Sequence, residues 1–304
     1  MDILKQHQIF ASAKSGLYTA FATFYPDKNN KVYIFYDSLL IGELNNFYFP
    51  VFDLMFHKFE TESETKLVLL IASNEVQIAY CSINLSPKVK VICEAVPEMY
   101  ADCVVQMRVM QNILIIRTGD KRICTFDLWQ DSFLSILLKN NQATKSSKLL
   151  QLENQQLQST ALELFDDKFF SCRQLGPNQF QGEIYTIQGK MFKIADQIKI
   201  EHQIFKIQFF NQNFYVLTEA GVAQYVLQNN LLELKENFTG DYSNFDIDQQ
   251  QNTIYIFGEK IFAISLGTWQ LDQQIDYQAE SMLKLDDTIL FFGQEGYYEF
   301  QNKK

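Results

Sequence analysis

Histidine is the side chain best suited to acid–base and metal chemistry near neutral pH, and this chain of 304 residues contains three of them. They are His7, His57 and His202, which lie far apart in the sequence and within or beside different strand-like runs. Zinc and acid–base sites need several groups brought to one point. The spacing of the three residues does not favour such a convergence, so we expect no histidine-based metal or catalytic site.

Sequence motifs of catalysis and cofactor binding are missing as well. The sequence contains no glycine-rich phosphate loop, no GxSxG nucleophile elbow and no HExxH zinc motif. We therefore expect no cofactor, no metal and no enzymatic activity. Carboxylates are numerous, with 36 Asp and Glu residues, so an alternative hypothesis is an enzyme that gathers acids and a cation around a central channel.

The charge balance is acidic, with a formal net charge of −10 at pH 7. Binding to nucleic acid requires clusters of Lys and Arg that neutralise phosphates, and the sequence shows no such cluster. This composition argues against direct nucleic-acid binding and favours protein partners, including ones with basic segments. The alternative is an accessory subunit that positions nucleic acid for a catalytic partner, as in an RNA-modifying, telomere or chromatin complex, and it requires a basic stripe on the surface.

The cysteines and the N-terminal residues bear on the compartment. Five cysteines fall in apolar strand-like runs without any CxxC pair: Cys81, Cys93, Cys103, Cys124 and Cys172. This usage is typical of buried, reduced thiols. The N-terminal run lacks the apolar stretch of a secretory signal, and no window has the ~18 uninterrupted apolar residues of a membrane span. We expect a soluble intracellular protein, cytoplasmic or nuclear.

Apolar runs joined by tight turns recur along the whole chain. The aromatic fraction of 14%, with 27 Phe and 15 Tyr, favours strands. Seven strand–turn–strand segments follow one another at intervals of roughly 35–57 residues, which is close to the period of propeller blades. They cover residues 32–44, 67–81, 115–129, 168–188, 214–227, 254–266 and 289–300.

This rhythm predicts an all-β fold, a seven-bladed β-propeller whose blades are four-stranded antiparallel sheets. The last blade, which ends at Phe300, supplies only three strands. The run 3–12 precedes the first blade, which we place from Gly16 onward, and it has no partner there. We therefore expect this N-terminal strand to close the last blade, where it would protect exposed sheet edges.

The segment 139–158 is the longest polar stretch of the chain. The strand rhythm resumes unchanged beyond it, so we interpret residues 1–304 as one propeller domain with a polar insertion between blades 3 and 4. The alternative is a two-sheet sandwich, or two β domains divided at this segment. Its leucines would line one side of a short helix that folds on a partner, and the competing interpretation is a disordered surface loop.

The third hairpin, IIRTGDKRICTFDLW at residues 115–129, resembles the second strand, Asp-containing turn and third strand of WD40-type propellers. Phe126-Asp127 stands where a Trp-Asp pair usually lies in that family. The segments IASNEVQIAYCS and FGEKIFAISLG have the same outline, although the chain contains no Trp-Asp and no Gly-His pair. The resemblance implies a divergent WD40-like propeller.

Acidic residues occupy six of the seven hairpin turns, which we assign to the connection between the second and third strands of each blade. They are Asp37, Glu75, Asp120, Glu219, Glu259 and Glu295. In a WD40-like ring all these turns open onto one face, so they would form a ring of negative charge suited to docking a basic peptide, tail or loop. The competing interpretation is that acids are simply favourable, solvated turn residues.

A second candidate surface is aromatic. The segment NNFYFPVF at residues 45–52 supplies Phe47, Tyr48 and Phe49 at the junction of the first two blades. Exposed together, they would mark a partner surface, whereas alternate residues of the run would otherwise belong to the core. We expect a non-catalytic protein–protein interaction scaffold, a subunit of a larger intracellular complex, because propellers present variable loops on a rigid frame.

Overall fold

The chain forms two compact units in a computed structural model. The first unit comprises Met1–Asn154 with Gln294–Tyr297, and the second comprises Gln155–Gly293 with Tyr298–Lys304. The structure describes residues 4, 7–24, 30–47, 49–60, 65–73, 76–81, 89–95, 103–110, 113–127, 159–177, 179–188, 191–200, 202–228, 231–286, 288–294 and 296–301. No helix in these ranges is long and apolar enough to cross a membrane.

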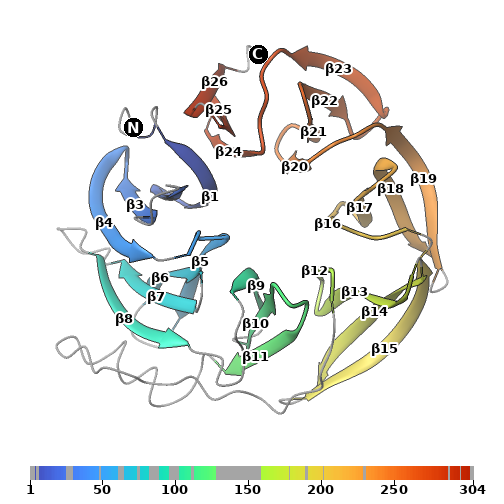
Figure 1. Ribbon diagram of the computed structural model, residues 1–304, viewed down its shortest axis with the longest axis horizontal. Coiled ribbons are helices and arrows are strands. Elements are labelled where there is room, and N and C mark those ends of the chain that lie inside the picture. Colours follow the sequence, from blue (N-terminus) through green and yellow to red (C-terminus); the bar gives the residue numbers. More distant parts are fainter. Residues whose placement is uncertain are drawn as a thin grey trace. The chain divides into compact units, whose positions relative to one another are not determined.

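Small antiparallel sheets make up the described part of the first unit (Figure 1). The first sheet consists of β1 (Gln8–Ser15), β2 (Tyr18–Phe24), β3 (Asn30–Tyr36) and β4 (Leu39–Phe47). The second sheet consists of β5 (Asp53–Glu60), β6 (Thr65–Ala72), β7 (Val76–Cys81) and β8 (Val89–Ala95). The third sheet consists of β9 (Val104–Met110), β10 (Ile113–Thr118) and β11 (Ile123–Asp127).

The rest of the described chain continues the same pattern. The fourth sheet consists of β12 (Ala161–Phe165), β13 (Lys168–Gly176), β14 (Gln179–Gln188) and β15 (Met191–Ile200). The fifth sheet consists of β16 (Lys206–Phe210), β17 (Asn213–Thr218), β18 (Gly221–Gln228) and β19 (Leu231–Thr239). The sixth sheet consists of β20 (Asn244–Asp248), β21 (Thr253–Phe257), β22 (Ile261–Ser265) and β23 (Gln270–Ile275). The last sheet consists of β24 (Ser281–Leu285), β25 (Thr288–Gly293) and β26 (Gly296–Gln301).

The core lies between successive sheets, which pack face to face as propeller blades do. In the first unit, Val32 and Ile34 of the first sheet pack in one cluster with Leu69 and Ile71 of the second. Second strands such as β6 are buried on both faces, because a neighbouring sheet covers each side. This explains why their sequences are continuously apolar rather than alternating. The protein is therefore an all-β, propeller-type assembly of antiparallel sheets.

In the second unit, aromatic side chains fill the core between adjacent sheets. Phe165 of the fourth sheet lies with its ring centroid 5.0 Å from that of Phe214 in the fifth. Tyr255 of the sixth sheet lies 5.3 Å from Phe291 of the last. Edge-on and tilted ring pairs of this kind add to the free energy gained by burying their area, so the high aromatic content serves the contacts between sheets.

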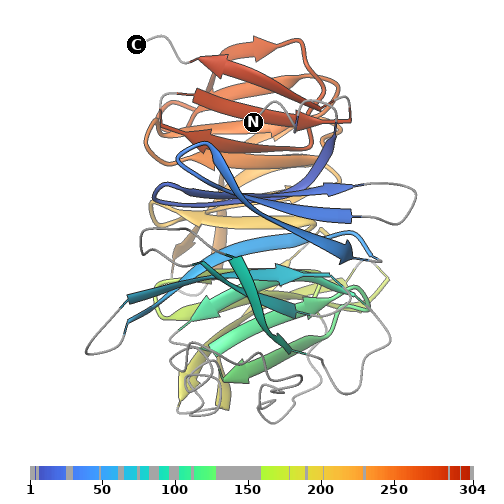
Figure 2. The same cartoon turned by 90° about the vertical axis from the view of Figure 1, so that its left-hand side faces the viewer.

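The N-terminal strand contradicts our expectation that it closes the last blade. β1 pairs with β2 along its whole length, from Gln8 opposite Phe24 to Ser15 opposite Tyr18. Figure 2 shows the strands of the first sheet from the side, with β1 among them. The prediction was wrong because it took the N-terminal run to have no partner in the first blade, whereas β1 pairs with β2 and buries Ile9 and Ala11 in the core. The first sheet therefore starts one strand earlier than predicted.

The uniform blade size was also wrong for the described residues, since the third and the last sheets each have three strands there. The boundary between the two units falls within the polar segment 139–158, which lies outside the described residues. Its folding on a partner stays a prediction, as does the interpretation of residues 1–304 as one domain.

Candidate functional site

Asp120 lies in the turn between β10 and β11, the second and third strands of the third sheet. Its carboxylate forms an ion pair with Arg122 and accepts a hydrogen bond from the Thr118 hydroxyl. The hydrogen bond from the Arg122 side chain is the largest cause that holds the pKa of Asp120 below its usual value. Asp120 therefore stabilises its own turn, and Arg122 balances its negative charge.

Asp37 does not occupy the connection to which we assigned it. It lies between β3 and β4, where Asp37 and Ser38 have φ angles of 46° and 65°, as two-residue hairpin turns require. Its backbone N–H donates to the Leu17 carbonyl in the β1–β2 turn, at 3.0 Å. The assignment was wrong because β1 shifts every later strand of this sheet by one position. Asp37 thus lies at the end opposite the connection between second and third strands.

The predicted aromatic patch separates in the structure. Phe47 is only 2% exposed and belongs to the core between the first two sheets. Phe49 is 52% exposed. Tyr48 lies outside the described residues, as do the predicted turn acids Glu75 and Glu295. A single exposed ring is an ordinary surface feature, so the described part of this segment offers no patch.

Two predicted acids of the second unit lie in turns between second and third strands, and both are exposed. Glu219 is in the β17–β18 turn and Glu259 is in the β21–β22 turn. The linkers that join successive sheets run along this same end of the unit. The Gly240 N–H donates to the Ala220 carbonyl at 3.4 Å, and the Ser243 N–H donates to the Phe257 carbonyl at 2.9 Å. Turns and linkers therefore form one continuous surface.

The linkers add two exposed acids that were not predicted from the sequence, Asp241 and Asp276. Together with Glu219 and Glu259 they form what we call the acidic end of the second unit. Among the described turn and linker residues at this end, the basic side chains are Lys260 and His202. Lys260 Nζ lies 3.6 Å from Asp276 Oδ1, and His202 Nδ1 lies 3.3 Å from Glu219 Oε1. The acids thus outnumber the bases at this end.

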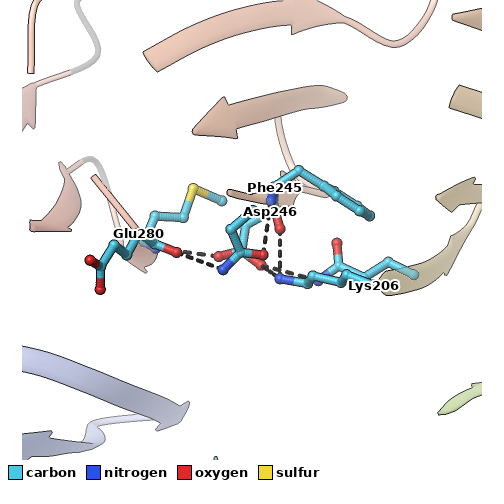
Figure 3. A network of polar contacts seen from close by, with 7 residues as sticks. Lys206, Phe245, Asp246 and Glu280 are labelled. Atoms are coloured by element: carbon cyan, nitrogen blue, oxygen red, sulfur yellow. Dashed lines mark hydrogen bonds and ion pairs between the residues drawn. The ribbon is translucent and has the colours of Figure 1, made fainter. Parts of the chain in front are cut away.

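A polar network joins the first strands of three successive sheets in the second unit (Figure 3). Asp246 of β20 accepts hydrogen bonds from Lys206 at 2.7 Å and Gln208 at 3.1 Å, both on β16. Its other carboxylate oxygen accepts from the backbone N–H of Met282 on β24, at 3.3 Å. Lys206 also donates to the carbonyl of Phe245, at 2.6 Å. One carboxylate therefore bridges three strands.

The first unit repeats this arrangement with different residues. Asp53 of β5 accepts a hydrogen bond from the backbone N–H of Met107 on β9, at 2.8 Å, and lies 3.5 Å from the Arg108 guanidinium. In the second unit, Asp248 of β20 likewise pairs with Lys284 of β24, at 2.8 Å. These acids on first strands are engaged with the neighbouring sheet, which gives them a structural role in fixing how adjacent sheets dock.

A buried carboxylate in the fourth sheet is satisfied in a similar way. Glu183 is 2% exposed, accepts a hydrogen bond from the Tyr185 hydroxyl, and lies 3.8 Å from Arg173 Nη1. Burial, followed by this hydrogen bond, raises the pKa of Tyr185 far above its ordinary value. The tyrosine therefore stays protonated and holds the acid in the interior.

The three histidines occupy different elements. His57 lies in β5, His202 lies in the linker after β15, and the His7 ring stacks at 6.5 Å from that of Tyr33. Within the described ranges, no group of three or more His, Cys, Asp or Glu side chains is arranged to hold a metal ion.

Comparisons with known proteins bear on the fold alone. No family model matches the sequence, and no curated protein matches it. Many solved structures match the fold, and one is a crystal structure of the computationally designed Ika8 protein. It is 13% identical, with 97% of this chain and 96% of that chain covered, at a TM-score of 0.55. At this identity the likeness concerns the arrangement of strands and carries nothing about function.

Proposed function

We propose that this protein is a non-catalytic scaffold that binds another protein, and that the acidic end of the second unit receives a basic segment of that partner. The observation that supports it is the gathering of Glu219 and Glu259, from turns of the fifth and sixth sheets, with Asp241 and Asp276, from the linkers that follow these sheets. The described turns and linkers at this end carry one lysine and one histidine against them. Propellers commonly act as interaction scaffolds, since a rigid frame presents variable loops.

Exposed charge of this kind mainly affects the rate of association and the choice of partner. Exposed acids at one end attract a segment rich in Lys or Arg and repel acidic competitors. Since the acids are exposed, salt screens them within about 10 Å at 0.1 M ionic strength. Binding through the acidic end should therefore weaken as salt increases.

The proposal extends to the architecture: a single WD40-like propeller of seven blades, acting as one subunit of an intracellular complex. The succession of seven short sheets along the described chain supports it. Small-angle X-ray scattering tests it, because one compact domain of this length should have a radius of gyration of about 19 Å. A clearly larger radius would mean two separate domains instead.

The functional test compares two triple variants that change the charge equally. In the first, Glu219→Gln, Asp241→Asn and Glu259→Gln neutralise the acidic end. In the matched control, Asp166→Asn, Asp167→Asn and Asp272→Asn remove exposed acids of the fourth and sixth sheets that lie toward the opposite end of the second unit. Tagged forms are purified from lysate of the source cells, with and without nuclease treatment, and the retained proteins are quantified by mass spectrometry.

The scaffold hypothesis predicts that at least one protein is retained by the wild type and the control and is lost with the acidic-end variant. Higher salt should release the same protein. Equal retention by all three forms would refute docking at the acidic end. Retention that disappears with nuclease treatment would instead favour the accessory role in positioning nucleic acid.

A further inference from the structure

A cleft of about 330 Å³, with five aliphatic side chains among its eight lining residues, opens between the fourth and fifth sheets of the second unit. Ile200 at the end of β15 and Ile204 of the following linker form one wall. Tyr225 of β18 with Leu232 and Leu234 of β19 form the other. The cleft therefore lies between the outer strands of two adjacent blades.

The cleft exists because the two sheets diverge. Their first strands, β12 and β16, pack closely, whereas the outer strands β15 and β19 barely contact each other. Phenylalanine rings, including Phe165 and Phe214, fill the inner part of the space. Toward the outer strands the side chains are smaller and half-buried, and Leu234 at the rim is 55% exposed. Exposed leucine beside an apolar cleft is a feature of interaction sites.

The polar groups at the cleft argue against a small polar ligand or cofactor. The Thr218 hydroxyl already accepts a hydrogen bond from the Ala220 N–H, at 3.2 Å. His202 faces Glu219 at 3.3 Å. Ligand pockets typically span roughly 300–1,000 Å³ and carry several polar groups that orient the ligand. This cleft is at the small end of that range, and its aliphatic residues Ile200, Ile204, Val216, Leu232 and Leu234 suit one or two apolar side chains.

The charge beside the cleft indicates which residues should lie next to an apolar side chain bound there. Glu219, which contacts the cleft residue His202, belongs to the acidic end. An occupant that placed a carboxylate here would be repelled, whereas a lysine or arginine would be attracted. The cleft and the acidic end are therefore parts of one surface, apolar on one side and negative on the other.

We propose that this cleft binds a leucine or phenylalanine side chain from an extended segment of a protein partner, and that a lysine or arginine next to it engages Glu219. This inference rests on the proposed scaffold function and names the chemistry of the partner. The apolar side chain supplies affinity by leaving water, and the basic residue selects the segment.

Short fluorescent peptides test the inference directly. The probes are Gly-Lys-Arg-Leu-Lys-Arg-Gly, the same peptide with Phe or Ala in place of Leu, and a Leu peptide in which Glu replaces every basic residue. Binding to the full chain is measured by fluorescence anisotropy at two salt concentrations. Two variants accompany the wild type: Leu234→Asp at the cleft, and Leu271→Asp, which changes a leucine of similar exposure, 49%, on the outer strand of the next sheet.

The Leu and Phe peptides should bind the wild type about tenfold or more tightly than the Ala peptide. Leu234→Asp should lower the affinity for the Leu peptide about tenfold, and Leu271→Asp should leave it unchanged. Equal binding of the Ala peptide, undiminished binding to the Leu234→Asp variant, or no binding of the Leu and Phe peptides at millimolar concentration would each overturn the inference. Equal binding of the Glu-containing peptide would overturn the role of Glu219.

Failure here is distinguishable from failure of the scaffold function. If a protein partner is retained in a manner that depends on the acidic end, yet these peptides do not bind, the cleft is not its site and only the present inference is lost. Circular dichroism and the urea midpoint verify that both exposed-leucine variants are folded. The Leu234→Trp variant, which keeps the rim apolar but narrows the entrance, should also weaken binding of the Leu peptide.

Discussion

Lys206 and Asp246 join two neighbouring sheets, with Lys206 Nζ 2.7 Å from Asp246 Oδ1. The same lysine nitrogen lies 5.3 Å from the centroid of the Phe245 ring, in range of a cation–π contact. Asp246 also accepts a hydrogen bond from the backbone N–H of Met282 on a third strand, so it connects three consecutive sheets. The acidic end is built on turns and linkers that these sheets carry, so its geometry depends on this network.

Asp246→Ala should lower the free energy of unfolding by about 1–3 kcal/mol, because it removes the acceptor of the Met282 N–H and the carboxylate that pairs with Lys206. Lys206→Met should cost less, since Asp246 keeps its other hydrogen bonds. Urea denaturation measures both. Asp272→Ala, at an exposed site on β23, is the control and should remain within about 0.5 kcal/mol of the wild type. Equal effects of all three would exclude the bridging role.

Gly221 starts β18 with a φ of +127°, and a Cβ at this position would lie 2.3 Å from the Phe238 carbonyl oxygen. Gly221→Ala should therefore destabilise the protein by about 2 kcal/mol or more. Gly267→Ala is the matched control, because the nearest heavy atom would lie 3.7 Å from the added carbon and the backbone φ is ordinary. Similar melting temperatures for the two variants would contradict the geometry of the β17–β18 turn.

The stability contributed by Asp120 should depend on pH. Because its pKa is lowered in the folded protein, the carboxylate stabilises the fold above the ordinary pKa of about 4 and loses this effect as the pH falls through the lowered value. Asp120→Asn should cost roughly 0.5–1 kcal/mol at pH 7. The difference between wild type and variant should shrink on acidification, as measured by urea unfolding from pH 7 to pH 3. A difference that stays constant would show that the charge plays no part.

Cys172 should resist alkylation in the folded protein. The side chain is fully buried, and burial is the largest cause that raises the pKa of its thiol. Raising the pH from 7 to 9 increases the thiolate fraction of an ordinary cysteine, but Cys172 should lag behind because its pKa is higher. Iodoacetamide labelling followed by peptide mass spectrometry measures each site, with urea-unfolded protein as the reference. Rapid labelling of native Cys172 would contradict its buried position in β13.

Much of the strand pattern could be predicted, because it is written in local residues. The continuous apolar run before Asp120 and the turn after Leu217 identify second and third strands without any knowledge of distant contacts. The first sheet was misassigned because the sequence showed no partner for β1 before Gly16, while the last blade lacked a fourth strand. Only its pairing with β2, a contact between strands, reveals where it belongs.

The candidate site was less accessible to sequence reasoning. Glu219 and Glu259 were identified from their turns, whereas Asp241 and Asp276 lie in linkers. All four acids lie at the same end of the second unit because of the direction in which the strands run. A strand-by-strand count would have supplied this signal, since a linker that leads into a first strand begins at the same end as the turn between second and third strands. The cleft beside Leu234 could not be predicted, because it depends on how two sheets diverge.

The most direct test of docking at the acidic end is zero-length cross-linking of the native complex. A carbodiimide couples a carboxylate only to a lysine in contact with it, so it reports the docking face without substitutions. The scaffold hypothesis predicts that partner lysines couple to Glu219, Asp241, Glu259 or Asp276, as identified by peptide mass spectrometry. Coupling of partner lysines to Asp166, Asp167 or Asp272 instead, with none at the acidic end, would contradict it.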